Sequence, residues 1–227
     1  MKQIINKLIF PNTHSSEAYV GYLRKNGVTI GKRTWFVRPK TNSIDVQRGI
    51  FVKIGDDVCI TEGVKVLAHD WSYSVLANYY KKAPGRQRCT IIGNNVFIGN
   101  GSIILMGANI GDNVIIGAGS VVSGQVESNS VYAGNPARKI YTLDQYYEKL
   151  SKDFETSAAC YFNRYREVYG QYPRLENVGL YATLFVEKSD SNMKKYFSQS
   201  AIPFALKNME KRYDTIEEFM EKQEEIK

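Results

Sequence analysis

Two histidines, His14 and His69, are the only imidazoles in the 227 residues. Imidazole is the side chain best suited to take a proton from a hydroxyl near neutral pH. His69 stands at the head of a long segment rich in aromatic, polar and basic residues, whereas His14 fits no pattern. Taken alone, His69 fits a structural or surface histidine as well as a catalytic base, and His14 is expected to be a surface residue of the N-terminal segment.

A six-residue repeat is the element that must position His69. Branched aliphatic residues recur every six positions, glycines follow most of them, and a small or short apolar residue stands four positions after each. The aliphatics are Ile92, Ile98, Ile104, Ile110, Ile116 and Val122, the glycines Gly93, Gly99, Gly111 and Gly117, and the small residues Val96, Ser102, Ala108, Val114 and Ser120. A period of six fits neither a strand nor an α-helix. It predicts a three-sided parallel β-helix with the aliphatics inside and glycines accommodating the corner dihedrals.

The run from Ile92 to Ile140 closely resembles the left-handed β-helix acyltransferases, such as the galactoside, maltose and streptogramin acetyltransferases and polysaccharide O-acetyltransferases. The resemblance covers residues 28–141, about half of the chain. It implies an all-β core, a left-handed parallel β-helix with hexapeptide repeats. The left hand comes from the resemblance alone, because crossover connections are overwhelmingly right-handed.

The repeat is interrupted where His69 lies. It loses register across residues 40–51, and the 26 residues between Val66 and Ile92 are not a multiple of six. A loop near residues 70–90 must therefore protrude from the coil, and loops on rigid scaffolds often carry function.

Helical segments are expected on both sides of the coil. Residues 1–27 form an N-terminal helical cap, with Ser15 or Ser16 capping a short helix, and residues 142–227 form a helical C-terminal extension. A capping box at Thr142 starts a helix that runs to about residue 169, with an apolar side made by Leu143, Tyr146, Tyr147 and Leu150. Asp214 or Thr215 caps a last helix that buries Phe219 and Met220.

The number of histidines and the missing Gly-rich motif argue against two other enzyme classes that use this repeat. Two histidines in one chain cannot form the three-imidazole zinc site of γ-type carbonic anhydrases, which share this repeat. Sugar nucleotidyltransferases with such repeats need a Gly-rich nucleotide-binding domain, and no such motif precedes Val28. Acyl transfer without a metal is the remaining expectation.

By resemblance, acetyl-CoA is the co-substrate and lies in a groove between neighbouring subunits of a homotrimer. The implied contacts are Asn100, Ala118, Ser123, Gly124 and Arg138, with Phe97 where many relatives have tryptophan. Small residues let the pantetheine arm approach the backbone, and Arg138 can meet phosphate. Some members carry a lysine at the position of Gly124 and a second arginine at that of Tyr141. This chain therefore has fewer cationic side chains to bind the phosphates of CoA.

The base of the resembled enzymes also lies where the coil gives way to the extended loop, some two dozen residues before the Ile-Gly-Asn-Asn run. His69 precedes Gly93 by 24 residues. It is expected to deprotonate the acceptor hydroxyl and return the proton to the leaving thiolate, without an acyl-enzyme. A backbone N–H near Asn100 is the expected oxyanion donor.

Other polar and aromatic residues are candidates for binding the acceptor. Asn42 and Asp45 are assigned by comparison with the family, whose sugar-binding residues come from a similar segment. Trp71 and Tyr73 either stack on a sugar ring or pack the loop, and both alternatives stay open. Asp70 is expected to point away from His69, because adjacent side chains on an extended backbone face opposite sides.

The net charge of +7 is compatible with nucleic acid, an anionic membrane or a phosphorylated small molecule. A cluster in the protruding loop consists of Lys81, Lys82, Arg86 and Arg88, without any nucleic-acid-binding signature, so no nucleic acid partner is expected. A solvated loop is the simpler interpretation, and a patch for a polyphosphate cofactor or anionic glycan is the alternative. No apolar run approaches the roughly 20 residues of a membrane span. Three separated cysteines (Cys59, Cys89, Cys160) predict free thiols in a cytoplasmic protein.

The sequence thus predicts an acetyl-CoA-dependent O-acetyltransferase acting on a carbohydrate hydroxyl, in surface polysaccharide or lipopolysaccharide biosynthesis. Three alternatives remain: a xenobiotic acetyltransferase of the streptogramin type, transfer to an amine of a nucleotide-linked amino sugar, and a non-catalytic trimeric β-helix scaffold. A scaffold would not bind CoA and would tolerate the loss of His69.

Overall fold

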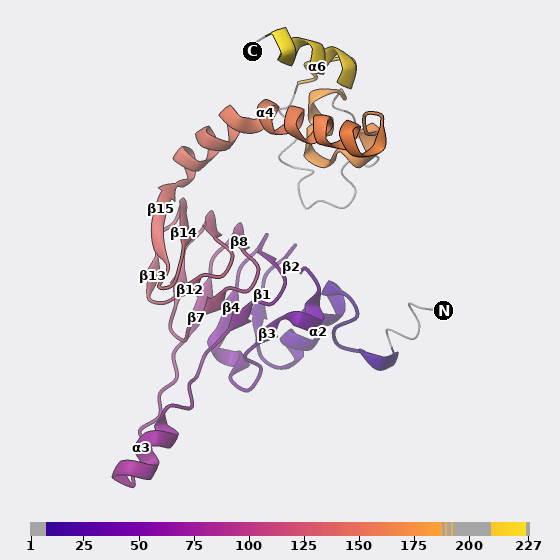
Figure 1. The fold of residues 1–227 in the computed structure, drawn as a ribbon. Helices are drawn as coiled ribbons and strands as arrows, with labels where there is room; N and C mark the ends of the chain where they lie inside the picture. Colours follow the sequence, from indigo (N-terminus) through magenta and orange to yellow (C-terminus); the bar gives the residue numbers. More distant parts are fainter. Residues whose placement is uncertain (1–7, 188, 190–191, 193–209, 226–227) are drawn as a thin grey trace. The chain divides into compact units, whose positions relative to one another are not determined.

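A computed structural model describes residues 8–187, 189, 192 and 210–225 of the chain. The chain divides into two compact units, residues 1–147 and 148–227. The first unit contains a parallel β-helix, and helices make up most of the described part of the second (Figure 1).

Three sheets form the flat faces of the β-helix, named faces A, B and C. Face A consists of β1 (Thr29–Ile30), β4 (Val52–Ile54), β7 (Thr90–Ile92), β10 (Asn109–Ile110) and β13 (Gln125–Val126). Face B consists of β2 (Trp35–Phe36), β5 (Cys59–Ile60), β8 (Val96–Ile98), β11 (Val114–Ile116), β14 (Ser130–Ala133) and β15 (Arg138–Thr142). Face C consists of β3 (Ser43–Ile44), β6 (Lys65–Val66), β9 (Ile103–Ile104) and β12 (Val121–Val122). All pairs are parallel except β14 with β15.

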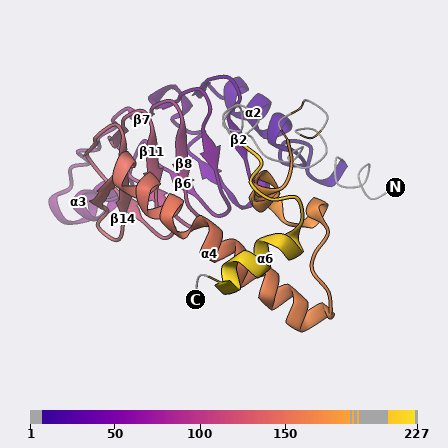
Figure 2. The same cartoon turned by 90° about the horizontal axis from the view of Figure 1, so that it is seen from above.

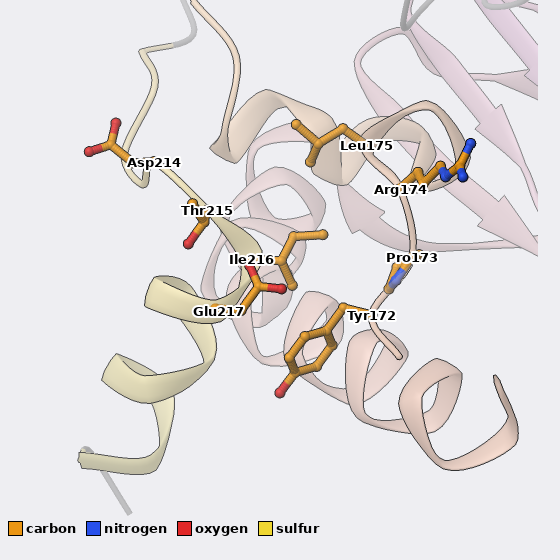
Figure 3. Close-up of a pocket in the computed structure, with 8 residues that line it drawn as sticks. All are labelled: Tyr172, Pro173, Arg174, Leu175, Asp214, Thr215, Ile216 and Glu217. Carbon is orange, nitrogen blue, oxygen red and sulfur yellow. The ribbon is translucent and has the colours of Figure 1, made fainter. Parts of the chain in front are cut away.

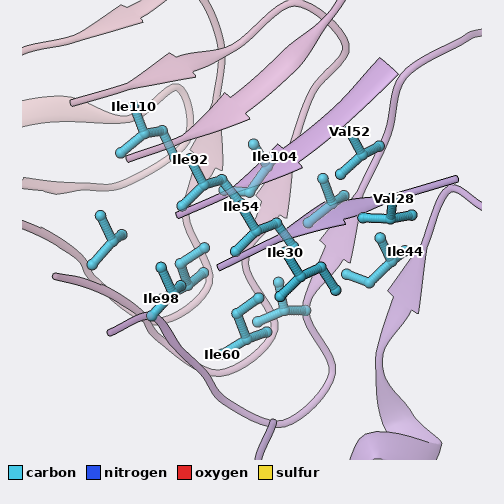
Figure 4. Close-up of a cluster of buried hydrophobic side chains, with 14 of the residues drawn as sticks. Val28, Ile30, Ile44, Val52, Ile54, Ile60, Ile92, Ile98, Ile104 and Ile110 are labelled. Carbon is cyan, nitrogen blue, oxygen red and sulfur yellow. The ribbon is translucent and has the colours of Figure 1, made fainter. Parts of the chain in front are cut away.

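The aliphatic residues of the repeat fill the interior of this prism (Figure 4). All six are at most 1% exposed, and the five small residues between them are at most 2% exposed. Burial of each large aliphatic side chain contributes about 1.5–3 kcal/mol. The predicted inward positions are confirmed.

The repeat glycines are needed for a reason other than the corner dihedrals that the sequence suggested. Gly93 and Gly99 do not adopt positive φ, whereas Asn95 and Asn113 do. A Cβ added to Gly93 would lie 2.6 Å from the carbonyl oxygen of Gly111, one coil away. These glycines are therefore required by the close approach of successive coils, and asparagines adopt the left-handed conformation at the corner between faces A and B.

A ladder of polar side chains follows that same corner. The Asn94 Oδ1 accepts a hydrogen bond from the Asp56 amide (2.9 Å), and the Asp112 Oδ1 accepts one from the Asn94 amide (2.6 Å). The Ser128 Oγ continues the series by accepting from the Asp112 amide (3.0 Å). Each coil thus supplies the acceptor for a corner N–H of its neighbour, which fixes the stacking register.

The N-terminal helix α2 (Ser16–Lys25) covers the first coil (Figure 2). Its Ser15 cap accepts a hydrogen bond from the Ala18 amide, and its buried residues join the coil core, as predicted. The segment expected to be out of register still contributes β3. Two short 3-10 helices, η1 (Pro39–Thr41) and η2 (Gly49–Phe51), accommodate its extra residues at the corners.

A protruding arm, residues 70–88, leaves the coil after β6 (Figure 1). The corner residues Asp56 and Asn94 lie 38 positions apart in sequence, compared with 18 for Asn94 and Asp112 on the next coil. The extra residues form the arm, which carries helix α3 (Tyr73–Tyr80). The predicted loop is therefore confirmed, with a helix inside it.

The last coil ends in an additional strand that the sequence analysis did not predict. After Pro136 the chain forms β15, which returns antiparallel to β14. Helix α4 (Leu143–Tyr169) then begins at the expected capping box, in which Thr142 and Gln145 exchange hydrogen bonds. Its expected apolar side is largely solvent-exposed, since Tyr147 is 72% and Leu150 50% exposed.

The second unit has its own apolar core around Phe162, Phe185 and Phe219. Besides most of α4 it contains η3 (Leu175–Asn177), η4 (Gly179–Leu184) and α6 (Ile216–Glu225). The Thr215 hydroxyl accepts a hydrogen bond from the Glu218 amide, so the predicted cap of the last helix is confirmed. Within the described residues, no helix is both long and apolar enough to span a bilayer.

The three free thiols are expected to differ in reactivity. Burial raises the pKa of the Cys59 thiol to about 11, and the thiolate is the reactive form, so Cys59 is almost fully protonated at pH 8. Cys89 and Cys160 are exposed. Titration of the native protein with a disulfide reagent at pH 8 should show two fast thiols and one slow thiol, and Cys59→Ser should remove only the slow phase. Three equal rates would contradict this.

Candidate active site

His69 lies at the corner where face C gives way to face A, at the root of the arm. Its backbone pairs with Gln87 in an isolated antiparallel bridge, and the Thr90 hydroxyl donates to the carbonyl of Leu67 (2.6 Å). The outgoing and returning ends of the arm are thus joined beside the imidazole. This arrangement fixes the backbone that carries the candidate base.

Asp45 holds the imidazole in place. Its Oδ2 lies 2.5 Å from His69 Nδ1, and its side chain is 3% exposed, compared with 18% for His69. The same carboxylate accepts hydrogen bonds from the amides of Ala68 (2.9 Å) and Arg48 (3.1 Å). A carboxylate at Nδ1 keeps the proton there, leaves the Nε2 lone pair available as the base, and stabilises the imidazolium that proton transfer would create.

These contacts indicate that Asp45 positions His69. Its Oδ2 contacts His69 and the Ala68 amide, and its Oδ1 accepts one hydrogen bond, from the Arg48 amide. Its assignment as an acceptor ligand stays a prediction. Asp70 does not position His69, as expected: it accepts hydrogen bonds from the amide and hydroxyl of Ser72, which lower the pKa of its carboxyl.

Asn42 forms hydrogen bonds within the coil. Its amide nitrogen donates to the carbonyl of Val37 (3.2 Å), and its side-chain oxygen accepts from the amide of Val64 (2.9 Å). Both ends of the side chain connect parts of the coil. Its assignment as an acceptor ligand stays a prediction.

Trp71 contacts the candidate base, His69. Its indole Nε1 donates a hydrogen bond to His69 Nε2 at 2.8 Å, although the residue is 62% exposed. The indole stacks on Tyr73, with ring centroids 5.7 Å apart, and the Tyr73 ring lies beside Gly85 on the returning side of the arm. Tyr73 thus packs within the arm, and Trp71 lies where an acceptor would have to approach the imidazole.

Basic residues of the arm occupy two places. Arg88 packs its side chain over Gly107, close to the corner of His69, and Arg86 Nε lies 3.8 Å from Asp70. Lys81 and Lys82 follow α3, away from the root of the arm. All four are exposed, so the cluster seen in sequence is split between the root and the far part of the arm.

The expected CoA contacts lie on two different corners of the prism. Ser123 and Gly124 follow β12 on the corner between faces C and A, which is the corner that His69 occupies two coils earlier. Asn100 and Ala118 follow β8 and β11 on the corner between faces B and C. Arg138 is near this second corner, since it pairs with the last residue of β14. All five residues are exposed, but one chain does not bring them together.

Comparison with known proteins identifies the family. The family model described as bacterial transferase hexapeptide (six repeats) matches residues 89–124. Protein CapG of Staphylococcus aureus is 36% identical over 163 residues, covering 72% of this chain and 91% of that protein. The chain belongs to the hexapeptide-repeat acyltransferase family. Its coil is accordingly a left-handed β-helix, as the sequence resemblance implied.

Two further proteins resemble this acyltransferase over shorter stretches. The putative acetyltransferase YvoF of Bacillus subtilis (strain 168) is 29% identical over 130 residues, covering 56% of this chain and 76% of that protein. A solved structure of soybean serine acetyltransferase complexed with serine is 29% identical with a TM-score of 0.39. It covers 50% of this chain, and this chain spans 40% of the soybean protein.

A shallow cavity of about 250 Å³ occurs in the second unit of the acyltransferase (Figure 3). It is lined by Tyr172, Pro173, Arg174, Leu175, Asp214, Thr215, Ile216 and Glu217. It is smaller than the roughly 300–1,000 Å³ typical of small-molecule sites, and no histidine or cysteine lines it. The candidate site therefore stays at the corner of His69, where an imidazole and a carboxylate are in contact.

Replacing Asp45 with asparagine tests its positioning role. Asp45→Asn is expected to lower the turnover number of acyl transfer roughly 10²-fold, because a neutral amide stabilises the imidazolium less than a carboxylate does. CoA affinity should change little. Steady-state kinetics and calorimetric CoA titration measure these effects. Asp57→Asn is the matched control, since Asp57 forms an exposed ion pair with Arg33 at a different corner. Equal activity of the two variants would contradict the role of Asp45.

Proposed function

We propose that this acyltransferase transfers the acetyl group of acetyl-CoA to a hydroxyl of a carbohydrate, in cytoplasmic steps of surface polysaccharide or lipopolysaccharide biosynthesis. One observation carries the proposal: a histidine at the root of an exposed arm has its Nδ1 engaged by a buried carboxylate. This arrangement suits a base that activates an alcohol. The acetyl group is supported by the name of the relative YvoF, and the carbohydrate by the sequence resemblance.

The proposed step needs only the side chains at this corner. Nε2 of His69 accepts the proton of the acceptor hydroxyl while its oxygen attacks the thioester carbonyl, and Asp45 stabilises the resulting imidazolium. Nε2 then returns the proton to the sulfur as the C–S bond breaks. The two bound substrates react directly, so no acyl-enzyme is required.

A homotrimer is proposed because the expected CoA contacts occupy two corners. A groove between neighbouring copies would place the His69 corner of one chain against the Asn100 corner of the next, and a three-sided prism suits threefold symmetry. The oxyanion donor near Asn100 would then come from the neighbouring copy. The outer side of face B also carries a row of apolar residues, Trp35, Cys59, Phe97 and Ile115, of which Phe97 is 41% exposed.

The residues on these corners fit the shape and charge of CoA. Gly124 adopts φ of +70°, and a Cβ there would meet nothing within 4 Å, so a slender chain can approach the backbone. Ala118 and Ser123 are exposed and small, and the exposed guanidinium of Arg138 is available to phosphate. Acetyl-CoA would supply the activated thioester there.

The proposal is tested by combining oligomeric state, CoA binding and transfer. Light scattering should give a trimer of the 25.8 kDa chain, and calorimetry should show CoA binding. A panel of oligosaccharides, nucleotide-linked amino sugars and a streptogramin, assayed with radiolabelled acetyl-CoA, distinguishes the acceptors. Acetylation of a sugar hydroxyl supports the proposal, and acetylation of the amine or the antibiotic replaces the proposed acceptor. A monomer that does not bind CoA would favour a scaffold.

A further inference from the structure

The indole of Trp71 occupies the one atom of His69 that catalysis needs. Nδ1 is engaged by Asp45, so the acceptor hydroxyl must reach Nε2, and Nε2 already accepts the Trp71 N–H at 2.8 Å. An N–H donor at Nε2 requires a lone pair there, which is the neutral form of the base. The indole N–H therefore stands where the hydroxyl of a bound acceptor would donate.

Local contacts aim the indole at His69 without burying it. Asp70 accepts hydrogen bonds from the amide (2.9 Å) and hydroxyl of Ser72, forming a turn that directs Trp71 back toward the imidazole. One face of the indole stacks on Tyr73, and the residue is 62% exposed. Because little of the Trp71 surface is buried, moving the indole away from His69 breaks mainly one hydrogen bond and one stacking contact.

We propose that Trp71 is a displaceable guard of the base: it occupies Nε2 when no acceptor is bound, and the acceptor hydroxyl replaces it. The inference rests on the proposed acetyl transfer. Without an acceptor, a water molecule at Nε2 could attack the thioester: Nε2 takes the proton of water, oxygen bonds to the carbonyl carbon, the C–S bond breaks, and the sulfur receives the proton. Acetate and free CoA result, and the acetyl donor is wasted. The Trp71 N–H keeps water from that position.

Hydrolysis of acetyl-CoA in the absence of any acceptor is the direct test. Trp71→Phe keeps an aromatic ring that can stack on Tyr73 but removes the N–H. We expect hydrolysis, followed as free thiol, to rise about fivefold, the factor that corresponds to ~1 kcal/mol for one net hydrogen bond. Tyr79→Phe, on the exposed end of α3, is the matched control and should behave as the unaltered protein. Adding His69→Ala to Trp71→Phe should abolish the increase, because the water is activated by that imidazole.

The outcomes separate this inference from the proposed function. Suppose that Trp71→Phe binds CoA but hydrolyses acetyl-CoA no faster than the unaltered protein. This result overturns the proposed guard role of Trp71 and leaves the proposed acetyl transfer intact. A parallel fall of hydrolysis and transfer would make Trp71 a support of the arm and would also overturn it. If no variant binds CoA in a calorimeter, the proposed function fails and the guard fails with it.

Discussion

His69→Ala is expected to lower acetyl transfer by roughly 10³-fold, within the range that general-base catalysis typically contributes. The imidazole is the only histidine at the corner, because His14 bonds to backbone carbonyls of the N-terminal segment. Truncation removes the base but leaves the corners expected to hold CoA. Transfer rates, CoA titration and thermal melting measure the three properties separately.

His14→Ala provides the matched control for this substitution. It removes the other imidazole of the chain, which forms an exposed hydrogen bond, and the variant should retain full activity. Added imidazole should restore part of the activity of His69→Ala, because a free base can enter the space that is left. If the two alanine variants were equally active, proton removal by His69 would have to be abandoned.

Gly93→Ala is expected to lower the free energy of unfolding by about 3 kcal/mol, because the close approach of two coils at this corner leaves no space for another carbon. The new Cβ would lie 2.6 Å from the Gly111 carbonyl oxygen and 2.6 Å from Asp112 Oδ1, and neighbouring coils would have to separate. For a chain of this length the melting temperature should fall by roughly 10 °C. Calorimetric or circular dichroism melting provides the measurement.

Gly21→Ala is the control for this loss. Gly21 lies in α2, where a Cβ would meet nothing within 4 Å, and alanine favours a helix by up to ~1 kcal/mol over glycine. Its melting temperature should stay level or rise. A similar fall for both substitutions would show that coil spacing is not what Gly93 protects.

The coil was predictable because its signal is local and repeated. Every six residues an aliphatic side chain must enter the prism, so the burial of Ile98, Ile104 and Ile116 follows from spacing alone. The arm was predictable for the complementary reason, since a break in spacing must leave the coil. The purpose of the glycines was not predictable, because close approach between coils is a three-dimensional property that a glycine in sequence does not distinguish from a turn.

The contact between Asp45 and His69 was not predicted because the corners of the coil near Asp45 are irregular. Asp45 lies 24 residues before His69, the same separation as between Ile30 and Ile54, which pair on adjacent coils. That coincidence could have placed the two side chains together. The segments η1 and η2 obscured it, because they insert residues between the hexads on either side of Asp45. No sequence signal indicated that Trp71 would turn back onto Nε2.

The two ends of the arm meet at the bridge between His69 and Gln87, so everything between them is an insertion at a single point of the coil. The hydrophobic interior continues across this point, with β4 pairing directly to β7. Segments of other length or composition can therefore be exchanged here without shifting any hexad. Under the proposed function, replacement of this one hairpin would change the surface that meets the acceptor, while His69 and Asp45 keep their places in the coil.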